Sequence, residues 1–276
     1  MFRRPGSIER KTPAQFAKMR SAGLLVSEAL TACANAVTPG VTTAELDMIA
    51  ADVIGSAGAQ PSFLGYYGFP AVICASVNDE VVHGIPSDRA LKVGDLVSID
   101  CGAIVDGWHG DAAVTVPVGD VGPELLRLSE TTRESLWQGI CAVAVGGRLG
   151  DIGAAVEGCV RATSPDYGIV RDYVGHGIGS QMHMSPPVPN FGRVGKGLRL
   201  KSGMAVAIEP MVTVGSADVS VLEDNWTVAT DTGNVAAHWE HTVAITDRGP
   251  WVLTAPDGGA AEFAARGVTS PASDLT

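Results

Sequence analysis

Two aspartates, Asp100 and Asp111, flank an Asp106-Gly107 dipeptide, which favours a tight two-residue hairpin turn. If residues 106 and 107 form the loop, residue 100 lies opposite residue 113. Asp111, two residues from 113, then points to the same face as Asp100. Two carboxylates this close repel each other unless a cation lies between them. The pair is therefore either solvated or part of a metal site.

Two glutamates lie in apolar, strand-like segments. Glu209 follows Met-Ala-Val-Ala-Ile, and Glu240 lies in Ala-Ala-His-Trp-Glu-His-Thr-Val-Ala-Ile. A carboxylate buried in such a segment needs a partner. Four carboxylates and one histidine suit two divalent cations, which can lie about 3.5 to 4 Å apart around a shared water. The chemistry expected of this set is metal-assisted hydrolysis.

The histidine candidates for this set are His176 and His183. Glycines on both sides of His176, in Val-Gly-His-Gly-Ile-Gly, leave its imidazole room to reach a metal. Taken alone, this glycine pattern favours an ordinary turn, because it lacks the context of a dinucleotide-binding loop. His83, in Val-His-Gly-Ile-Pro, is either structural or functional. Three more histidines are expected to be structural or outer partners of the site, with His238 on the same strand face as Glu240: His109, His238 and His241.

Helices and strands must bring these residues together. Thr12-Pro13-Ala14-Gln15 is a capping-box start for a helix that runs to about Val37. A second helix begins at Thr43. Strand-like runs follow, and helical composition then returns twice. The strand-like runs are 71–77, 95–102 and 111–118, and the helical segments are about 122–144 and from about 151.

The same order of elements occurs twice along the chain. Residues 92–100 align with residues 201–209, sharing Lys, Gly, Val and Ile, and each segment ends in a carboxylate. The repeat predicts two α+β halves around a pseudo-twofold axis. The alternative is that the shared pattern is only a common turn that enters a strand.

Composition and charge exclude several classes of protein. The chain has 276 residues, 46% of them hydrophobic, and its 34 glycines show no collagen-like period. A net charge of −11 argues against a surface that binds nucleic acid. Five cysteines without a Cys-x-x-Cys pair indicate reduced thiols. Because neither a secretory segment nor a membrane-spanning stretch is present, a soluble cytoplasmic protein is expected.

We expect one catalytic domain between two short tails. Residues 1–11 are basic and polar and form either a solvated tail or an arm that contacts the ribosome. Residues 12–255 are expected to form a single domain, with halves at about 12–120 and 121–250. Residues 256–276, rich in Gly, Ala and Ser, are predicted to be poorly ordered.

An ordered set of motifs gives these residues a family resemblance. The chain resembles the type I methionine aminopeptidases over about residues 12–250, with Val-Asn to His-Gly-Ile-Pro at 77–86 and Trp-His-Gly-Asp at 108–111 also in order. The resemblance implies an α/β (α+β) pita-bread fold, with two pseudo-twofold-related halves around an antiparallel sheet. It also implies removal of the N-terminal methionine when the second residue is small. The matching residues are Asp100, Asp111, His176 in Gly-His-Gly-Ile-Gly, Glu209 in Ile-Glu-Pro-Met and Glu240 in Glu-His-Thr.

The resemblance implies a centre with two divalent metal ions. Asp100 would chelate one ion, and Asp111 and Glu240 would bridge both. His176 and Glu209 would complete the second site. Oxygen-rich sites with one histidine accept Co, Mn, Fe and Zn with modest discrimination, so the metal stays open.

The resemblance also implies catalytic roles. A metal-bridging water would attack the first peptide carbonyl, and Glu209 would accept its proton and pass it to the leaving amine. His183 would stabilise the oxyanion, and His83 would contact the scissile amide. The substrate's free amine would ligate the metal held by Asp100, which fixes the cut one residue from the end.

A pocket for the methionine side chain is implied as well. The chain departs from the commonest bacterial pattern with Phe69 in place of Tyr, Met182 in place of an aromatic residue and Phe63 where Cys is frequent. These differences leave the pocket apolar and affect its exact selectivity. The pocket residues implied are Phe63, Tyr66, Phe69, Cys74, Met182 and Trp226.

Three other classes of protein share this fold. An aminopeptidase P or prolidase usually carries an additional N-terminal domain, for which a first helix near Thr12 leaves no room. A type II enzyme carries an insert that the spacing between His183 and Glu209 excludes. A catalytically inactive, ribosome-binding homologue is disfavoured by the intact ligand set. The expected partners are nascent polypeptide N-termini, short Met-initiated peptides and possible contact with the ribosome, and a monomer is expected.

Overall fold

The computed structural model describes residues 8–271, and its first helix begins where the capping box predicts. Thr12 accepts a hydrogen bond from the Gln15 amide, and the Gln15 side chain accepts one from the Thr12 amide at 2.8 Å. The Thr42–Glu45 pair caps the second helix in the same way. The helices are α1 (Pro13–Ala36), α2 (Thr43–Ser56), α3 (Pro123–Cys141), α4 (Leu149–Thr163) and α5 (Ala260–Ala265), with a 3₁₀ turn η1 (Tyr66–Gly68).

A nine-stranded antiparallel sheet forms the centre of the molecule, in the order β1-β4-β5-β14-β9-β7-β8, with β2 paired to β4 and β15 paired to β14. Two three-stranded sheets, β13-β10-β6 and β11-β12-β3, lie beside it. The strands are β1 (Gln60–Pro61), β2 (Ile73–Val77), β3 (Glu80–Val82), β4 (Leu96–Val105), β5 (Trp108–Pro117), β6 (Tyr167–Ile169), β7 (Gly175–Gly177), β8 (Met184–Val188), β9 (Ala205–Ile208), β10 (Met211–Val214), β11 (Val219–Val221), β12 (Val228–Thr230), β13 (Ala236–His238), β14 (Glu240–Thr246) and β15 (Gly249–Val252).

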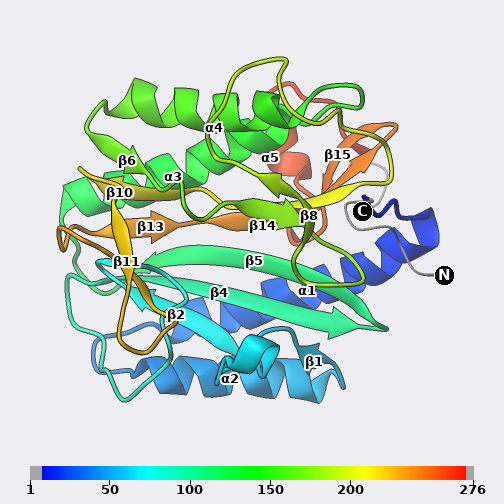
Figure 1. Cartoon of the computed structure of the whole chain (residues 1–276). Coiled ribbons are helices and arrows are strands. Elements are labelled where there is room, and N and C mark those ends of the chain that lie inside the picture. The colour runs from blue at the N-terminus through cyan, green and yellow to red at the C-terminus, as the bar shows by residue number, and fades with distance from the viewer. Residues whose placement is uncertain (1–7, 272–276) are drawn as a thin grey trace.

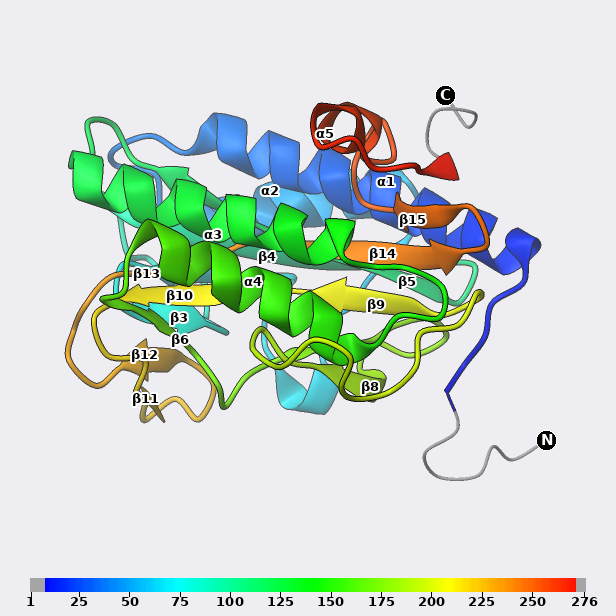
Figure 2. The ribbon, with the colours of Figure 1, turned by 90° about the horizontal axis from the view of Figure 1, so that it is seen from above.

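The two helix pairs cover the two halves of the large sheet. In Figure 1, α3 and α4 lie above the central strands and α1 and α2 lie below them, and Figure 2 shows the same pairs from above. Helix α1 packs on β4 and β5, and α3 packs on β9 and β14. Each half therefore repeats one arrangement, two helices against a pair of long strands.

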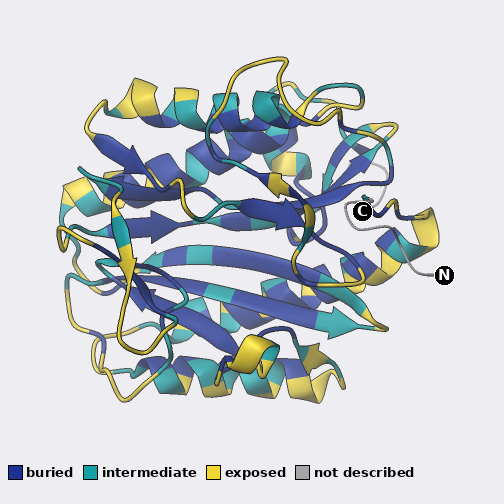
Figure 3. Cartoon of the chain, viewed as in Figure 1, coloured by how far each residue is buried: buried dark blue, intermediate teal, exposed yellow. Residues whose placement is uncertain are grey.

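The internal repeat predicted from the sequence corresponds to strands β4 and β9. Asp100 lies within β4, and Glu209 directly follows β9. Each half has its own apolar core, with residues such as Leu46 and Ile99 in the first and Ile152 and Ile208 in the second. Figure 3 shows that the central strands are largely buried, whereas the outer faces of the helices are exposed. Asp100 and Glu209 thus lie in, or directly after, buried strands of the large sheet.

The β4–β5 hairpin has the geometry expected from its turn residues. Asp106 and Gly107 both have positive φ angles, 50° and 77°, as a type I′ turn requires. The resulting register pairs Asp100 with Ala113. This confirms that Asp100 and Asp111 point to one face of the sheet.

One helix boundary and the C-terminal segment differ from the sequence predictions. Helix α4 begins at Leu149 rather than near Asp151, because the Asp151 carboxylate accepts a hydrogen bond from the Arg148 amide at 2.7 Å and so caps the helix from within its first turn. The segment expected to be poorly ordered from residue 256 contains helix α5. Phe263 of α5 is 1% exposed and packs edge-on against Trp137.

The N-terminal segment also differs from a free tail where the structure describes it. Glu9 and Lys11 are buried, at 4% and 7% exposure. The rest of the basic segment that was a candidate ribosome-contacting arm, residues 1–7, lies outside the described residues. Among the helices of residues 8–271, none is long and apolar enough to cross a membrane.

Candidate active site

One cavity brings together every residue that the sequence analysis places in the metal, catalytic and methionine-binding sets. It encloses about 580 Å³ of space including its open mouth. Its walls come from both halves of the fold. The lining residues are Phe63, Tyr66, Phe69, Cys74, His83, Asp100, Asp111, His176, Met182, His183, Glu209, Trp226 and Glu240.

Strand register places three carboxylates side by side on the sheet. Ala113 of β5 pairs with Asp100 of β4 on one side and with Glu240 of β14 on the other. Asp111, two residues from Ala113, points to the same face. The fourth carboxylate, Glu209, follows Ile208, which pairs with the neighbour of Glu240 in β14. Three adjacent strands and the end of a fourth therefore present acids to one cavity.

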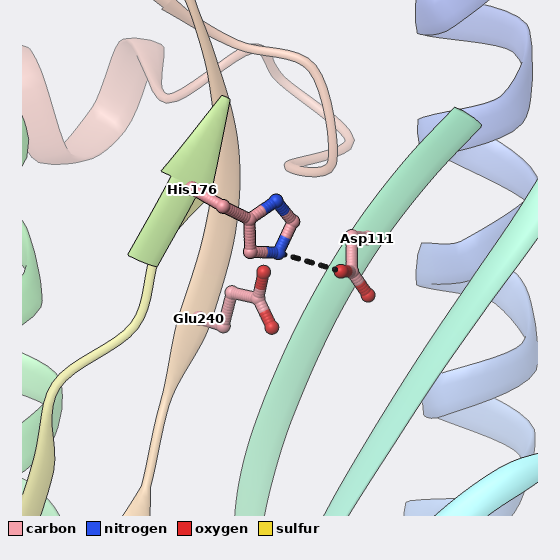
Figure 4. A group of neighbouring side chains, drawn as sticks. All are labelled: Asp111, His176 and Glu240. Carbon is pink, nitrogen blue, oxygen red and sulfur yellow. Dashed lines mark ion pairs between the residues drawn. The ribbon is translucent and has the colours of Figure 1, made fainter. Parts of the chain in front are cut away.

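His176 completes this group from strand β7. Its Nε2 lies 3.6 Å from Asp111 Oδ2 and 3.5 Å from Glu209 Oε1. Figure 4 shows the His176 ring aimed at Asp111, with the Glu240 carboxylate beside both. Ligand atoms of Asp111, His176 and Glu240 all lie within 4.8 Å of one another.

Burial raises the pKa of each carboxylate in the cavity. The pKa of Asp111 rises to about 8, and that of Asp100 rises well above its usual value because of burial and then of the Asp111 charge. Burial and the neighbouring aspartates likewise raise the pKa values of Glu209 and Glu240. Without a counter-charge some of these four acids bind protons at neutral pH, and bound cations would allow all four to ionise together.

Unpartnered oxygen atoms support the same interpretation. Asp100 Oδ1, Asp111 Oδ1 and Glu240 Oε1 are buried and have no hydrogen-bond partner among residues 8–271. Buried polar atoms in native proteins are almost always satisfied. These oxygens point to ligands that the polypeptide does not supply, and carboxylate oxygens suit divalent cations.

The hydrogen bond of His176 uses Nδ1 and leaves Nε2 free to act as a metal ligand. Nδ1 lies 3.0 Å from the Gly177 carbonyl oxygen. A carbonyl only accepts, so Nδ1 carries the proton. Burial lowers the pKa of His176 to about 4, which keeps the ring neutral and leaves a lone pair on Nε2.

Two further histidines line the cavity between the acids and the apolar pocket. The His183 ring lies 4.3 Å from that of His176, and its Nδ1 contacts the Tyr66 hydroxyl at 2.9 Å. His83, at a positive φ of 62°, faces Tyr173 and Trp226 edge-on. Burial lowers the pKa of His83 to about 4, so it is neutral at pH 7.

The apolar wall is formed by the six residues expected of a methionine pocket. Phe63, Phe69, Cys74 and Met182 are buried and belong to one core cluster, with Tyr66 and Trp226 packed against it. The Phe69 and Trp226 rings meet edge-to-face at 5.1 Å. This wall is part of a core that continues into helix α1 through Phe16 and Met19.

The remaining histidines lie outside the cavity lining. His109 contacts the Ser62 hydroxyl at 3.0 Å, and His241 contacts the Thr254 hydroxyl at 2.8 Å. His238 lies closest to the acids, with Nε2 3.8 Å from Glu209 Oε2 and without a hydrogen-bond partner among the described residues. It forms a second potential metal-binding group with Glu209 and Glu240, as expected for an outer partner of the site.

One residue that supports the site has no signal in the sequence. Asn190 is fully buried, and its side-chain amide donates to the Glu209 carbonyl at 2.9 Å. It thereby fixes the backbone that carries this carboxylate. A single asparagine after a proline has no motif that would have revealed this role.

Comparison with known proteins assigns this fold and site to a class. The family model of metallopeptidase family M24 matches residues 17–247. The chain is 53% identical over 252 residues to methionine aminopeptidase 1 of Mycobacterium tuberculosis, covering 90% of this chain and 95% of that protein. It is 48% identical over 244 residues to methionine aminopeptidase 1 of Bacillus subtilis, covering 88% and 98%.

Solved structures agree with these relatives. Methionine aminopeptidase from Rickettsia prowazekii superposes with a TM-score of 0.87 at 42% identity, covering 90% of this chain and 100% of that one. The enzyme from Thermotoga maritima gives 0.88 at 40%, covering 90% and 99%. The chain therefore belongs to metallopeptidase family M24 and, within it, to the type I methionine aminopeptidases. The expected pita-bread fold and metal-dependent hydrolase class are confirmed.

The prolidase alternative shares only the fold. Prolidase from Pyrococcus furiosus superposes with a TM-score of 0.70 at 22% identity, and this chain covers 65% of its length. Identity at that level carries no argument about substrate.

Proposed function

We propose that this cavity removes the N-terminal methionine from nascent proteins and short peptides whose second residue is small, by hydrolysis of the first peptide bond with two divalent cations. The proposal rests on one observation above all. Four buried acids with raised pKa values line the cavity beside a neutral histidine and next to an apolar pocket. Three of these acids have an oxygen atom without a hydrogen-bond partner among the described residues. Among the described residues that line the cavity, no lysine or arginine is present to balance the charge of the four acids.

The metal ligands proposed are the four acids and His176. Asp100 would chelate one ion, Asp111 and Glu240 would bridge two, and His176 with Glu209 would complete the second position. The unpartnered oxygens of Asp100, Asp111 and Glu240 and the free Nε2 lone pair of His176 fit this assignment. When bound, the cations supply Lewis-acid activation of water and of the scissile carbonyl.

Each remaining polar residue has a proposed role in the reaction. Glu209, at the edge of the acidic group, accepts the proton of the attacking water and delivers it to the leaving amine. His183, held at Nδ1 by the Tyr66 hydroxyl, offers Nε2–H to the oxygen that becomes negative. His83 contacts the scissile amide from the opposite wall.

The positions of the lining residues along the cavity explain the proposed selectivity for the first two residues of the substrate. The apolar wall of Phe69, Met182 and Trp226 accommodates an unbranched thioether, and the neighbouring acids anchor the free amine of the substrate. The cut is therefore fixed one residue from the N-terminus. Because His83 and the acids line the cavity beside this apolar wall, we infer that only small second residues fit.

We place this reaction in the cytoplasm, on nascent chains, with the protein acting as a monomer and with a single catalytic domain that contains residues 12–255 and helix α5. All five cysteines are free thiols and three are buried, which suits a reducing compartment. We also propose that residues 1–11 contact the ribosome.

Metal reconstitution tests the proposal. The purified protein is stripped with a chelator, titrated with Mn, Fe, Co or Zn, and assayed on Met-Gly-Ser and Gly-Pro-Ser peptides. We expect two equivalents of metal and release of methionine only. Release of glycine from Gly-Pro-Ser would favour the proline-directed class, and a protein that binds no metal and cleaves neither peptide would favour a binding module.

A further inference from the structure

A buried ion pair lies outside the cavity, in the segment that precedes helix α1. Lys11 Nζ lies 3.5 Å from Glu9 Oε1, and both side chains are almost completely buried, at 2% and 3% exposure. Burying two charges is costly unless hydrogen bonds satisfy their remaining polar atoms. The hydrogen-bond partners of Glu9 and Lys11 therefore indicate which segment of the chain this ion pair keeps in place.

Both charged groups hold the loop that follows strand β7. Glu9 accepts hydrogen bonds from the Ser180 amide at 3.1 Å and the Ser180 hydroxyl at 2.6 Å. The Lys11 ammonium donates to the Ile178 carbonyl oxygen. The Lys11 amide also donates to the Gly203 carbonyl at 2.6 Å, just before strand β9. The pair thus connects the N-terminal segment to residues 178–180.

Gly179 lies directly against this pair. A Cβ at Gly179 would lie 2.2 Å from Glu9 Oε1 and 2.4 Å from Lys11 Cε, so any side chain would displace the pair. The Gly179 carbonyl also accepts from the His109 amide at 2.9 Å. The last glycine of Gly-His-Gly-Ile-Gly is therefore required by close packing of Glu9 and Lys11.

The held loop carries two residues of the cavity. Met182 and His183 lie between the end of β7 at Gly177 and the start of β8 at Met184, where no sheet pairing fixes the backbone. Its position depends on contacts such as those of Ile178, Gly179 and Ser180. A shift of about 1 Å in a substrate-positioning group can reduce turnover about a hundredfold.

We infer that the Glu9–Lys11 pair positions Met182 and His183. From outside the cavity, the pair sets the shape of the methionine pocket and the location of His183, which is proposed to stabilise the oxyanion. This inference rests on the proposed function for the roles of Met182 and His183. The pair contacts neither the substrate nor the acidic group. Its removal should therefore change selectivity and turnover while metal binding stays intact.

Three variants test the inference. Ser180→Ala removes only the hydroxyl that donates to Glu9. The double variant Glu9→Gln/Lys11→Met removes both charges of the pair together, so that neither is left buried opposite a lost partner of this pair. Arg10→Ala is the matched control, because Arg10 lies in the same segment but is exposed and bonds the Ser202 carbonyl through its own Nε at 2.8 Å.

For Ser180→Ala and the double variant we expect kcat to fall about tenfold or more, and the preference for Met-Ala over Leu-Ala peptides to fall at least about threefold. Metal stoichiometry and affinity, measured by calorimetry, should match those of the wild type. Arg10→Ala should stay within about twofold in every measurement. Unchanged kcat and unchanged selectivity in a folded Ser180→Ala protein and a folded double variant would overturn the inference.

Hydrogen exchange separates this inference from the proposed function. In both variants, amides of residues 179–184 should exchange at least about tenfold faster than in the wild type, while those of β14 stay unchanged. This result would stand even if the wild type cleaved no peptide. If the double variant failed to fold, the exchange rates of Ser180→Ala would decide, and unchanged protection there would refute the positioning role.

Discussion

His176 Nε2 lies 3.6 Å from Asp111 Oδ2, and this contact joins the two halves of the fold. Asp111 belongs to β5 of the first half, and His176 belongs to β7 of the second. The cavity therefore exists only when both halves pack on the common sheet. A substitution in either half of the fold should therefore affect the same metal centre.

Replacement of Glu209 by Gln should lower turnover at least about a hundredfold, the scale expected for loss of a proton acceptor that is also a metal ligand. Asp111→Asn should have a comparable effect. Steady-state assays on Met-Ala-Ser, with circular dichroism to verify folding, measure this. Glu223→Gln, which alters an exposed acid, is the control and should retain full activity. A fully active Glu209→Gln protein free of wild-type enzyme would refute the assigned role.

In the metal-free protein, Asp111 should contribute a loss of stability as pH rises from 6.5 to 8. In this window the unfolded Asp111 carboxylate is ionised, whereas in the fold, with a pKa of about 8, it still binds a proton. At Asp111 the folded state therefore binds more protons than the unfolded state, so its contribution to the free energy of unfolding falls with pH. The histidines act in the opposite direction, because burial lowers their pKa values in the fold while the unfolded histidines release protons in this window, so the Asp111 contribution is read from a comparison with a variant that lacks this carboxylate.

For Asp111 alone the loss should be about 1 to 2 kcal/mol across this window. Urea unfolding of chelator-treated protein at several pH values measures it. Saturating Mn should abolish the loss, because bound cations replace the protons. The Asp111→Asn variant should lack this contribution, so the difference in free energy of unfolding between the wild type and the variant should change by about this amount across the window. An equal pH dependence in both proteins would contradict the assignment.

Lowering the pH should release metal and activity together. The ligand carboxylates must be deprotonated and His176 neutral to bind a cation, so affinity falls as these groups take up protons. Metal content after equilibrium dialysis at pH 5 to 8, measured beside peptide turnover, checks this. Turnover that persists in a sample shown to be free of metal would be incompatible with the proposed centre.

The first-residue pocket should prefer methionine but accept its near isosteres. Met182 is a flexible thioether, so norleucine should be released readily. Leucine should be released slowly rather than excluded, because a shape change of one methylene costs about 1 to 3 kcal/mol in an apolar pocket. Assays of Met-Ala, norleucine-Ala and Leu-Ala peptides measure this, and faster release from Leu-Ala than from Met-Ala would contradict the pocket assignment.

The second-residue site should reject long side chains. Met-Lys peptides should be cleaved far more slowly than Met-Ala peptides under identical metal loading. The comparison isolates the second residue because the first is unchanged. Efficient cleavage of Met-Lys would contradict the restriction assigned to His83 and the acidic group.

Helix α5 should contribute substantially to stability. Phe263 is buried against Trp137, so Phe263→Ala should destabilise the protein by about 3 to 5 kcal/mol. Chemical denaturation of the metal-loaded protein measures the change. Phe263→Leu, which keeps most of the apolar volume, should cost much less. A negligible effect of the alanine variant would mean that the C-terminal segment packs without energetic consequence.

The sequence by itself determined much of this protein, because several of its signals are local. Thr12 and Thr42 specify helix starts through side chains three residues away, and Asp106-Gly107 specifies a hairpin whose register follows from its loop length. Strand alternation then places Asp100 and Asp111 on one face. The apolar context of Glu209 and Glu240 indicated that these acids are buried and need a partner.

Tertiary structure alone decided how segments distant in sequence meet. The pairing of β5 with β14 places Glu240 beside Asp111, and no local signal encodes a contact across so many residues. The same holds for Asn190 under the Glu209 backbone and for Glu9 and Lys11 on the loop of Met182. Long-range contacts are chosen by the packing of whole faces, which depends on every residue of the core. Sequence patterns predicted which residues do chemistry, and packing of the two halves brought them within reach of one another.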